Sequence, residues 1–290
     1  MGNYYLYRMG LFLAGIFPLK VSRVLVRVLC DFHFCFSTTD RRAVENNLKV
    51  ISGRDEVPAA QVRAVFRNFG QYLLEFFISS RCLKPDFIQS NVRVQNLEHL
   101  NEVLQRGKGG ILVSAHLGSW ELGGTVLPMM GFPLSVVALA HKDPRVNALF
   151  NRRRESFGAM VIQTDVAVRR IADHLQQNRL IAILADRDFG NRGMHMDFLG
   201  RQTMVPKGAA FFSLKMGVPI VPIFFIRSAN DQYEIKVYPP IEPPALNGPA
   251  KVTEDMIREC IRKYLTVIEQ EILKNPSQWL IFREFWQPCA

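Results

Sequence analysis

Short apolar runs alternate with amphipathic segments along most of the chain. Stretches typical of β-strands occur at 92–95, 110–115, 135–140, 159–163, 180–185, 218–226 and 233–238. Apolar residues at helical spacing, with suitable start and stop residues, predict helices at 98–105, from Asp143 onward, and at 166–177, 207–216 and 253–274. This alternation predicts a mixed α/β fold, mainly a central β-sheet flanked by helices on both faces.

The first eighty residues are predicted to be helical. Segments 41–51 and 58–80 follow capping residues, and the second carries an apolar stripe that is rich in phenylalanine. We interpret this stripe as core rather than as an acyl-chain pocket, because helices that cover a sheet need such a stripe.

Residues 4–29 form a separate apolar and basic segment. The apolar stretch 9–19 is interrupted by Pro18, and Lys20, Arg23 and Arg27 follow at helical spacing. A transmembrane helix needs about 20 apolar residues, and a signal peptide needs an early basic region and a small-residue cleavage site. We therefore predict an amphipathic membrane-associated helix that is partly inserted into an anionic surface, with a basic core helix as the alternative. The predicted division is 1–36, which associates with the membrane, and 37–290, the catalytic domain.

Composition narrows the class of protein. The chain has 290 residues, 48% hydrophobic and 21% charged, which is typical of a folded globular protein. Its net charge of +10 indicates an anionic partner such as a membrane surface, a phosphorylated substrate or nucleic acid. Five scattered cysteines, Cys289 among them, form no CxxC pair and indicate a reducing compartment without a disulfide framework or zinc site.

The strand at 110–115 leads into the strongest candidate for chemistry. His116 ends this strand, Gly118 permits a sharp turn, and Ser119 can cap a helix that begins at Trp120. Glu121 lies five residues after His116 and is predicted to fold back onto it, fixing one tautomer as in a general base. A buried histidine with satisfied hydrogen bonds is the alternative.

The block GGILVSAHLGSWELGG resembles the His-x4-Asp/Glu block of the glycerolipid acyltransferase superfamily. Within it, the sequence is similar to the bacterial lipid A late (lauroyl/myristoyl) acyltransferases, including the mycobacterial phosphatidylinositol mannoside acyltransferase-like enzymes, over about residues 5–286. The resemblance implies that His116 is the general base, that Glu121 supports it, and that the N-terminal region anchors the protein to a membrane.

A second acidic segment follows the strand at 180–185. Asp186, Arg187 and Asp188 stand at its carboxyl end, where open-sheet enzymes place their active sites; a turn with a local ion pair is the alternative. Together with the turn at 197–200, the segment resembles a later block of the same family. The resemblance implies that Asp186 assists His116, that Arg187 binds acceptor phosphate or stabilises the oxyanion, and that Asp188 contributes to the substrate site.

Further basic and glycine residues are candidates for substrate binding. Arg152, Arg153 and Arg154 form either a solvated face or a phosphate-binding group, and the resemblance implies contact with acceptor phosphates or the acyl donor. Lys207 opens a helix whose N-terminus suits an anion. Backbone N–H groups around Gly118 are candidates for an oxyanion hole.

Together these features predict a membrane-associated O-acyltransferase on the cytoplasmic face of the inner membrane. His116 deprotonates an acceptor hydroxyl, which attacks a fatty acyl thioester on acyl carrier protein or coenzyme A without a covalent enzyme intermediate. The favoured acceptor is a phosphorylated glycolipid of lipid A type; a phosphatidylinositol mannoside or a lysophospholipid is the alternative. We expect no metal and no cofactor beyond the acyl thioester co-substrate.

A protein without catalysis is the alternative of a different class. It would be a basic module that binds a membrane or nucleic acid. The basic stretches lack the interleaved aromatics of single-strand binders, and no helix-turn-helix or RNP motif is visible. We therefore expect no nucleic-acid partner.

Overall fold

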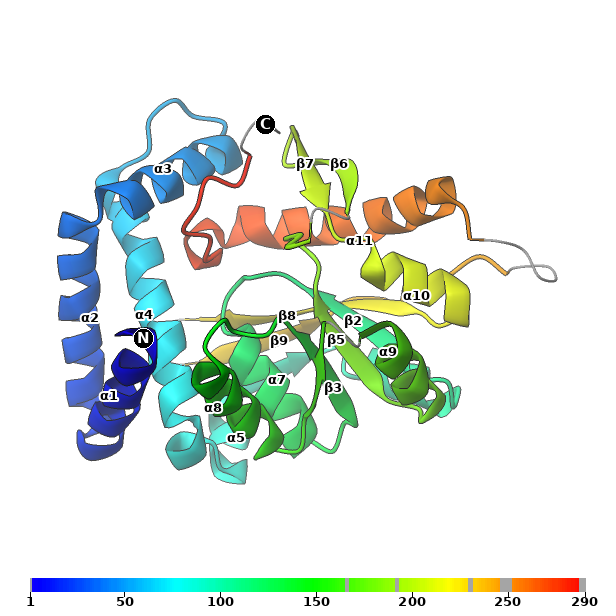
Figure 1. The fold of residues 1–290 in the computed structure, drawn as a ribbon, viewed down its shortest axis with the longest axis horizontal. Coiled ribbons are helices and arrows are strands. Elements are labelled where there is room, and N and C mark those ends of the chain that lie inside the picture. The colour runs from blue at the N-terminus through cyan, green and yellow to red at the C-terminus, as the bar shows by residue number, and fades with distance from the viewer. Residues whose placement is uncertain (1, 165–166, 191–192, 229–231, 246–251, 287–290) are drawn as a thin grey trace.

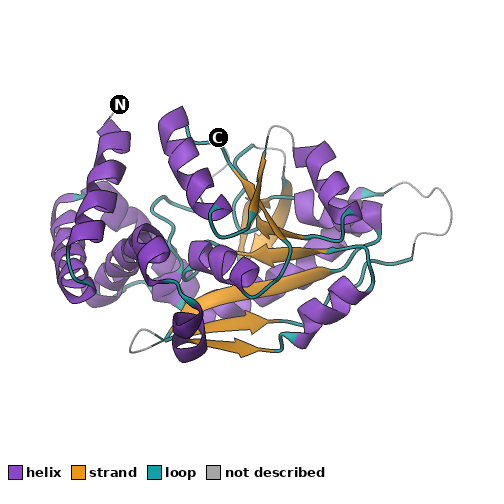
Figure 2. Cartoon of the chain, turned by 90° about the horizontal axis from the view of Figure 1, so that it is seen from below, coloured by secondary structure: helices purple, strands orange, loops and turns teal. Residues whose placement is uncertain are grey.

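The computed structural model describes residues 2–164, 167–190, 193–228, 232–245 and 252–286. Its centre is a seven-stranded sheet in the order β1-β9-β8-β2-β5-β3-β4 (Figures 1 and 2). The strands are β1 (Val92–Gln95), β2 (Gly110–Ser114), β3 (Leu134–Ala138), β4 (Met160–Gln163), β5 (Leu180–Leu184), β8 (Ile220–Arg227) and β9 (Tyr233–Val237). All seven lie where the sequence predicted strands, within a few residues at each end.

Five neighbouring strands of this sheet run in the same direction. Strands β8, β2, β5, β3 and β4 pair in parallel, whereas β9 runs antiparallel to β8 and pairs in parallel with β1. The carboxyl ends of the five strands therefore share one edge of the sheet. This is the edge where parallel sheets place their ligands.

Helices cover both faces of the sheet, as predicted (Figure 2). On one face of the sheet, Ile111 and Val113 of β2 join a core with α9 (Ala167–Gln176), α10 (Gly208–Met216) and α11 (Glu254–Lys274). On the other face, Leu112 joins a core with α6 (Glu98–Gln105) and α7 (Trp120–Met129). This alternation follows from the twofold side-chain period of a strand. Val166, the predicted first residue of the α9 segment, lies outside the described residues.

Four helices form a separate group beside the sheet. They are α1 (Gly2–Ile16), α2 (Leu19–Phe36), α3 (Thr38–Ser52) and α4 (Ala59–Cys82) (Figure 1). The predicted single helix at 4–29 is two helices, because the chain breaks at Pro18. On α4, Val62, Val65 and Phe66 are buried, which confirms the core interpretation of its stripe.

The N-terminal helices pack on α4 and also expose apolar side chains. Gly70 of α4 fits against α2 so closely that an added Cβ would lie 2.1 Å from the Cys30 Sγ. None of the helices in the described part of the chain has the length and apolarity needed to cross a membrane. The division at residues 36 and 37 falls between α2 and α3, and it stays a prediction.

A small hairpin was not predicted. Strands β6 (Met194–Phe198) and β7 (Arg201–Val205) pair antiparallel, and the turn at Leu199 and Gly200 has φ values of 52° and 76°. Two positive φ values are the signature of a two-residue type I′ turn. The Leu199 N–H donates to the Glu269 carboxylate of α11 at 2.6 Å, which fixes the hairpin to the body of the fold. The remaining elements are α5 (Pro85–Asn91), α8 (Pro144–Glu155) and the 3₁₀ turn η1 (Pro276–Gln278).

Candidate active site

The register of β2 and β5 brings His116 and Asp186 together. Ser114 is paired with Leu184, and the Ala185 N–H donates to the Ser114 carbonyl at 2.8 Å. His116 and Asp186 each follow two residues after this last pair. The sequence predicted both residues at strand ends, and the parallel pairing places them side by side at the carboxyl edge of the sheet.

Asp186 holds His116 through two hydrogen bonds. The His116 backbone N–H lies 2.9 Å from Oδ2, and the imidazole Nδ1 lies 2.9 Å from Oδ1. The Trp279 indole N–H also donates to Oδ2, at 3.0 Å. Burial alone would raise the pKa of Asp186, but the charge of His116 and the hydrogen bonds from His116 and Trp279 outweigh it and lower that pKa. Asp186 is therefore an ionised carboxylate that orients the ring.

The other imidazole nitrogen of His116 is available for chemistry. With the proton on Nδ1, held by Asp186, Nε2 is the basic nitrogen. No described residue forms a hydrogen bond with Nε2, and the His116 side chain is 16% exposed. Trp120 and Phe189 contact the ring edge-on, with centroid distances of 5.3 and 6.2 Å. This geometry would allow His116 to act as a general base, because Nδ1 is held by Asp186 and Nε2 has no hydrogen-bond partner among the described residues.

Glu121 lies in a different place from the one predicted. Its carboxylate binds the Arg154 guanidinium of α8, with Nε–Oε2 at 2.9 Å and Nη2–Oε1 at 2.5 Å, rather than His116. The first turn of α7 presents Trp120 to His116 and turns Glu121 toward α8. The hydrogen bond expected from Glu121 to His116 is thus made by Asp186, which is distant in sequence.

The turn at Gly118 is built for close packing. Its φ is 67°, and a Cβ there would lie 2.2 Å from the Phe225 carbonyl, so glycine is required. The Gly118 N–H donates to the Gln278 carbonyl at 2.9 Å, and the Ser119 N–H donates to the Phe225 carbonyl at 2.8 Å. Both donors are occupied, so the oxyanion hole predicted around Gly118 is not formed by these two groups.

A buried network that sequence analysis missed fixes the start of α7. Ser119 precedes α7 as predicted, but its hydroxyl donates to Glu75 of α4 instead of capping the helix. Glu75 also accepts from Arg227 at 2.7 and 2.9 Å and from the Tyr233 hydroxyl at 2.8 Å. Arg227 reaches Asn68 of α4 at 3.0 Å. A glutamate inside an otherwise apolar helix stripe was the available signal, because a buried charge needs a partner.

The C-terminal segment completes the site. The Leu280 N–H donates to the His116 carbonyl at 2.8 Å, and Trp279 bridges to Leu117. Asn47 of α3 holds the same segment by bonds to the Arg283 carbonyl at 2.8 Å and the Phe285 N–H at 3.0 Å. In Figure 1 this red segment rises from α11 beside α3 toward the hairpin. The sequence alone assigned Trp279 no contact with the active site.

The three consecutive arginines of α8 have three different environments. Arg152 is exposed and forms no hydrogen bond or ion pair with any residue in the described ranges. Arg153 donates to the Phe77 carbonyl at 3.1 Å and to the Ser80 hydroxyl, so it ties α8 to α4. Arg154 is engaged with Glu121. The three arginines therefore do not form the predicted phosphate-binding cluster. Of the three, Arg152 alone faces solvent.

The remaining predicted site residues are also separated. Asp188 accepts the N–H groups of Gly190 at 3.3 Å and Gly193 at 3.2 Å, which shapes its own loop. Lys207 lies 3.7 Å from Glu254 at the start of α11. The Arg187 guanidinium stacks on the Phe189 ring at 4.2 Å, close to His116. Of these three residues, Arg187 shares a neighbour, Phe189, with the His116–Asp186 pair.

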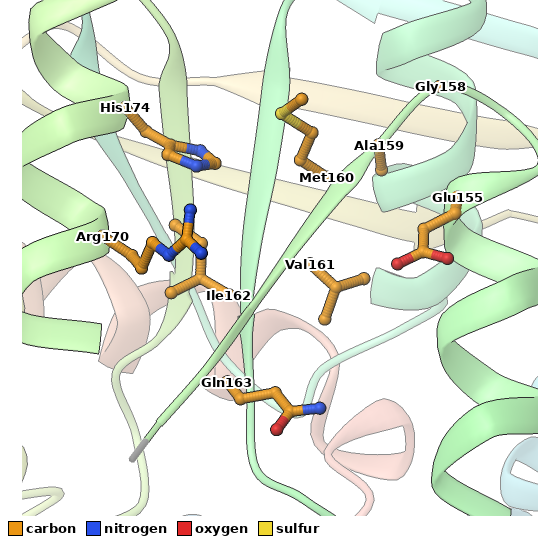
Figure 3. Close-up of a pocket in the computed structure, with 9 residues that line it drawn as sticks. All are labelled: Glu155, Gly158, Ala159, Met160, Val161, Ile162, Gln163, Arg170 and His174. Atoms are coloured by element: carbon orange, nitrogen blue, oxygen red, sulfur yellow. The ribbon is translucent and has the colours of Figure 1, made fainter. Parts of the chain in front are cut away.

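Two cavities occur away from this pair. One of about 630 Å³ follows edge strand β4, with Arg170 and His174 on the α9 side and Glu155 on the α8 side (Figure 3). The other, about 510 Å³, lies between the β6–β7 hairpin and α11. Neither is lined by His116 or Asp186. Within the described residues, no group of three or more His, Cys, Asp or Glu side chains is arranged to hold a metal ion.

Fold and site together define an α/β protein in which a buried carboxylate orients a histidine at the carboxyl edge of a largely parallel sheet. The chain belongs to the bacterial lipid A biosynthesis acyltransferase family, whose family model matches residues 1–287. It is thus an acyltransferase, as the resemblance of the His116 block implied.

Three relatives show the range of this family. The phosphatidylinositol mannoside acyltransferase of Mycolicibacterium smegmatis is 27% identical over 69% of this chain and 67% of its own length. That of Mycobacterium tuberculosis is 25% identical over 79% of this chain and 71% of its own. The lipid A biosynthesis palmitoleoyltransferase of Escherichia coli is 25% identical over 76% of this chain and 69% of its own.

Proposed function

We propose that the protein transfers a fatty acyl group from an acyl thioester to a hydroxyl of a phosphorylated glycolipid of lipid A type. The observation that carries this proposal is the His116–Asp186 pair, with Nε2 open on the side away from the carboxylate. The donor is acyl carrier protein or coenzyme A carrying the acyl chain. Phosphatidylinositol mannoside is the second candidate acceptor. The observation that supports this second candidate is the similarity to the two mycobacterial enzymes.

The proposed reaction needs one base and no covalent enzyme intermediate. Nε2 of His116 takes the proton of the acceptor hydroxyl while its oxygen forms a bond to the thioester carbonyl carbon. Asp186 stabilises the imidazolium that results. The carbon–sulfur bond then breaks, and the imidazolium returns the proton to the thiolate. Neither nearby serine suits the role of nucleophile, because Ser114 ends β2 and the Ser119 hydroxyl is engaged with Glu75.

We also propose that α1 and α2 lie on the cytoplasmic face of the inner membrane. Their outer surface exposes large apolar side chains, among them Phe12 at 65%, Val24 at 63% and Phe32 at 62%. Lys20, Arg23 and Arg27 lie among these residues. An apolar face bordered by basic side chains is the composition of an interfacial helix on an anionic membrane.

A vesicle assay tests the membrane proposal. The double variant Val24→Asp/Phe32→Asp should no longer sediment with phosphatidylglycerol vesicles. The matched control is Val168→Asp/Leu273→Asp, which places the same two charges on exposed apolar residues of α9 and α11 and should bind as the wild type does. Equal sedimentation of the double variant and the control would contradict the proposal.

A direct assay tests the reaction. Purified protein is incubated with palmitoyl-coenzyme A or palmitoyl-acyl carrier protein and with either a lipid A precursor or phosphatidylinositol mannoside. Mass spectrometry should then show one added palmitoyl group on one acceptor, and His116→Ala should remove that product. If no acceptor gains an acyl group with either donor, the proposed function is wrong.

A further inference from the structure

We propose that Arg170 and His174 form a second binding site, separate from the His116–Asp186 pair, which binds a medium-chain fatty acid by its carboxylate. The site is the cavity of about 630 Å³ along edge strand β4 (Figure 3), a volume in the range of small-molecule sites. Because neither His116 nor Asp186 lines this cavity, the inference does not depend on the proposed function. Arg170 and His174 were not predicted as site residues from the sequence.

A buried chain of hydrogen bonds sets the tautomer of His174. The Arg179 Nε–H donates to the Ser135 hydroxyl oxygen at 2.8 Å, and that oxygen lies 2.8 Å from His174 Nδ1. Burial and then the charges of Arg179 and Arg170 outweigh that of Asp173 and lower the pKa of His174, so the ring is neutral near pH 7. Ser135 is fully buried, and its hydroxyl hydrogen has no other acceptor among the described residues. A buried hydroxyl needs an acceptor, so Nδ1 accepts this hydrogen and Nε2 carries the proton of the ring.

The Nε2 atom of His174 therefore differs in chemistry from that of His116. In His116, Nδ1 faces a carboxylate and holds the proton, which leaves Nε2 as an acceptor. In His174, Nδ1 accepts from a hydroxyl, which makes Nε2–H a donor. This Nε2 forms no hydrogen bond with any described residue and is not sealed from solvent, so it opens into the cavity that His174 lines. His174 is thus suited to bind an anion rather than to act as a second base.

Arg170 supplies a positive charge beside this donor. It lies four residues before His174 on α9, so the two side chains share one face of the helix. Figure 3 shows both of them on the α9 side of β4. Arg170 is exposed and forms no ion pair or hydrogen bond with any residue in the described ranges. A guanidinium and an imidazole N–H on one helix face together suit a carboxylate.

The acidic residues nearby limit the charge of the ligand. Glu155 lines the cavity from the α8 side of β4, across the strand from Arg170 in Figure 3, whereas Asp173 does not line it. With His174 neutral, the lining side chains carry one positive and one negative charge. A singly charged anion at Arg170 is balanced by the guanidinium, but a phosphate dianion would leave an excess of negative charge near Glu155. The charges therefore favour a carboxylate.

Strand β4 places an apolar surface next to the two donors. Side chains alternate between the faces of a strand, so Met160 and Ile162 lie on the same face. Ile162 is buried in a core that includes Ile171 of α9, which makes this the α9 face of the sheet. Met160 is 46% exposed on that face. A fatty acid would place its carboxylate on the two donors and its alkyl chain on Met160.

Calorimetry with octanoate tests the site, with octanamide as the neutral analogue of the same shape. The full-length wild type should bind octanoate more tightly than octanamide. Arg170→Gln should weaken octanoate binding about tenfold, since a charge-assisted hydrogen bond is lost, and should leave octanamide binding unchanged. Met160→Glu, which adds a carboxylate to the cavity, should also weaken octanoate binding. The matched control is Arg169→Gln, because Arg169 is an exposed arginine of α9 that does not line the cavity.

Nitrogen NMR of the histidine-labelled protein tests the tautomer, with His174→Gln to assign the signals. The proton should be found on Nε2, and octanoate should shift the Nε2 signal in Arg169→Gln but not in Arg170→Gln. A proton on Nδ1 would overturn the donor role of His174. Equal affinity of the wild type for octanoate and octanamide, or Arg170→Gln that binds octanoate as tightly as Arg169→Gln, would overturn the site. A purely structural effect of Arg170→Gln would weaken both ligands alike and would equally count against it.

Discussion

Two buried carboxylates bind the segment 116–119 that precedes α7, Asp186 at His116 and Glu75 at Ser119, and they are used in different ways. Glu75 is surrounded by protein donors from Arg227, Tyr233 and Ser119. Asp186 also accepts protein hydrogen bonds, but its principal partner, His116, keeps one ring nitrogen unbonded among the described residues. The first network is closed within the protein, whereas the second ends at the surface where a substrate can be bound.

The comparison separates support from chemistry. A closed buried ion pair favours a unique local structure, and all of its hydrogen bonds are made to other protein groups. An open pair gives little local stability beyond orientation, but it leaves a basic atom for a proton transfer. Burial of a carboxylate alone therefore does not identify a catalytic group. The unbonded Nε2 atom of His116 is the feature on which the proposed catalytic role rests.

The largest effect is expected at the open pair, His116 and Asp186. His116→Ala should reduce acyl transfer by about 10²–10⁴-fold, the usual contribution of a general base, with the fold intact. His195→Ala, which changes an exposed histidine of the hairpin, serves as the control. Steady-state rates and circular dichroism check both statements. Near-normal turnover in folded His116→Ala would end the base assignment.

The next largest effect is expected in the closed network around Glu75, and it is an effect on stability. Glu75→Gln should lower the free energy of unfolding by about 3–5 kcal/mol, because it leaves the Arg227 charge buried without its partner. Urea denaturation measures this loss, and Glu155→Gln on the surface of α8 is the control. The double variant Glu75→Leu/Arg227→Met should recover part of the stability. A Glu75→Gln protein as stable as the control would show that the network is not closed as described.

Asp186→Asn probes the orienting carboxylate. We expect a fall in kcat of about 10–10³-fold, smaller than for His116→Ala, since the base remains but loses the charge that stabilises its protonated form. KM should change little, because orientation matters most in the transition state. A defect confined to KM would instead make Asp186 a binding residue.

Glu121→Gln distinguishes the two acidic residues near His116. Because Glu121 pairs with Arg154 rather than with His116, its removal should lower turnover only about tenfold, through displacement of the first turn of α7. The pH profile of kcat should keep the wild-type shape, whereas Asp186→Asn should alter it. An altered profile in Glu121→Gln would restore the original role predicted for Glu121.

The smallest effect concerns acid stability. The folded-state pKa of Asp186 is lowered from its ordinary value of 3.8, against the effect of burial, by His116 and Trp279. The contribution of Asp186 to the free energy of unfolding is therefore complete above its ordinary pKa of 3.8. This contribution is lost as the pH falls through the lower folded-state pKa. The stability difference between wild type and Asp186→Asn should shrink below about pH 3.8. Unfolding free energies measured from pH 3 to pH 6 check this trend.

Much of the fold follows from local sequence patterns. The alternation of apolar strands and amphipathic helices placed all seven strands of the sheet, and Asp143 and Thr253 cap their helices as predicted. The hairpin β6–β7 was missed because its turn uses Leu199 at positive φ instead of the usual Asn-Gly or Gly pair. The alternation of Met194, Met196 and Phe198 with polar residues was the signal that could have revealed it.

The site was predictable where its residues are near each other in sequence or stand at strand ends. His116 and Asp186 were found because each follows a buried strand. Choosing Glu121 as the partner of His116 favoured sequence proximity, whereas the structure uses strand register, which one sequence does not specify. Trp279 and Glu75 reach the site by tertiary packing, 93 residues from Asp186 and 44 residues from Ser119 respectively, so no local pattern connects them to it.

The hydrogen bond from Trp279 to Asp186 has a consequence for the time order of biosynthesis. A ribosome makes α1 and α2 before His116, His116 before Asp186, and Asp186 before Trp279. During that interval the aspartate lacks its indole donor, and the His116 carbonyl lacks the N–H of Leu280. The apolar surface of the first two helices is thus made before the hydrogen bonds of Asp186 are complete. On the proposed function, a nascent chain would meet the lipid surface before it could react there.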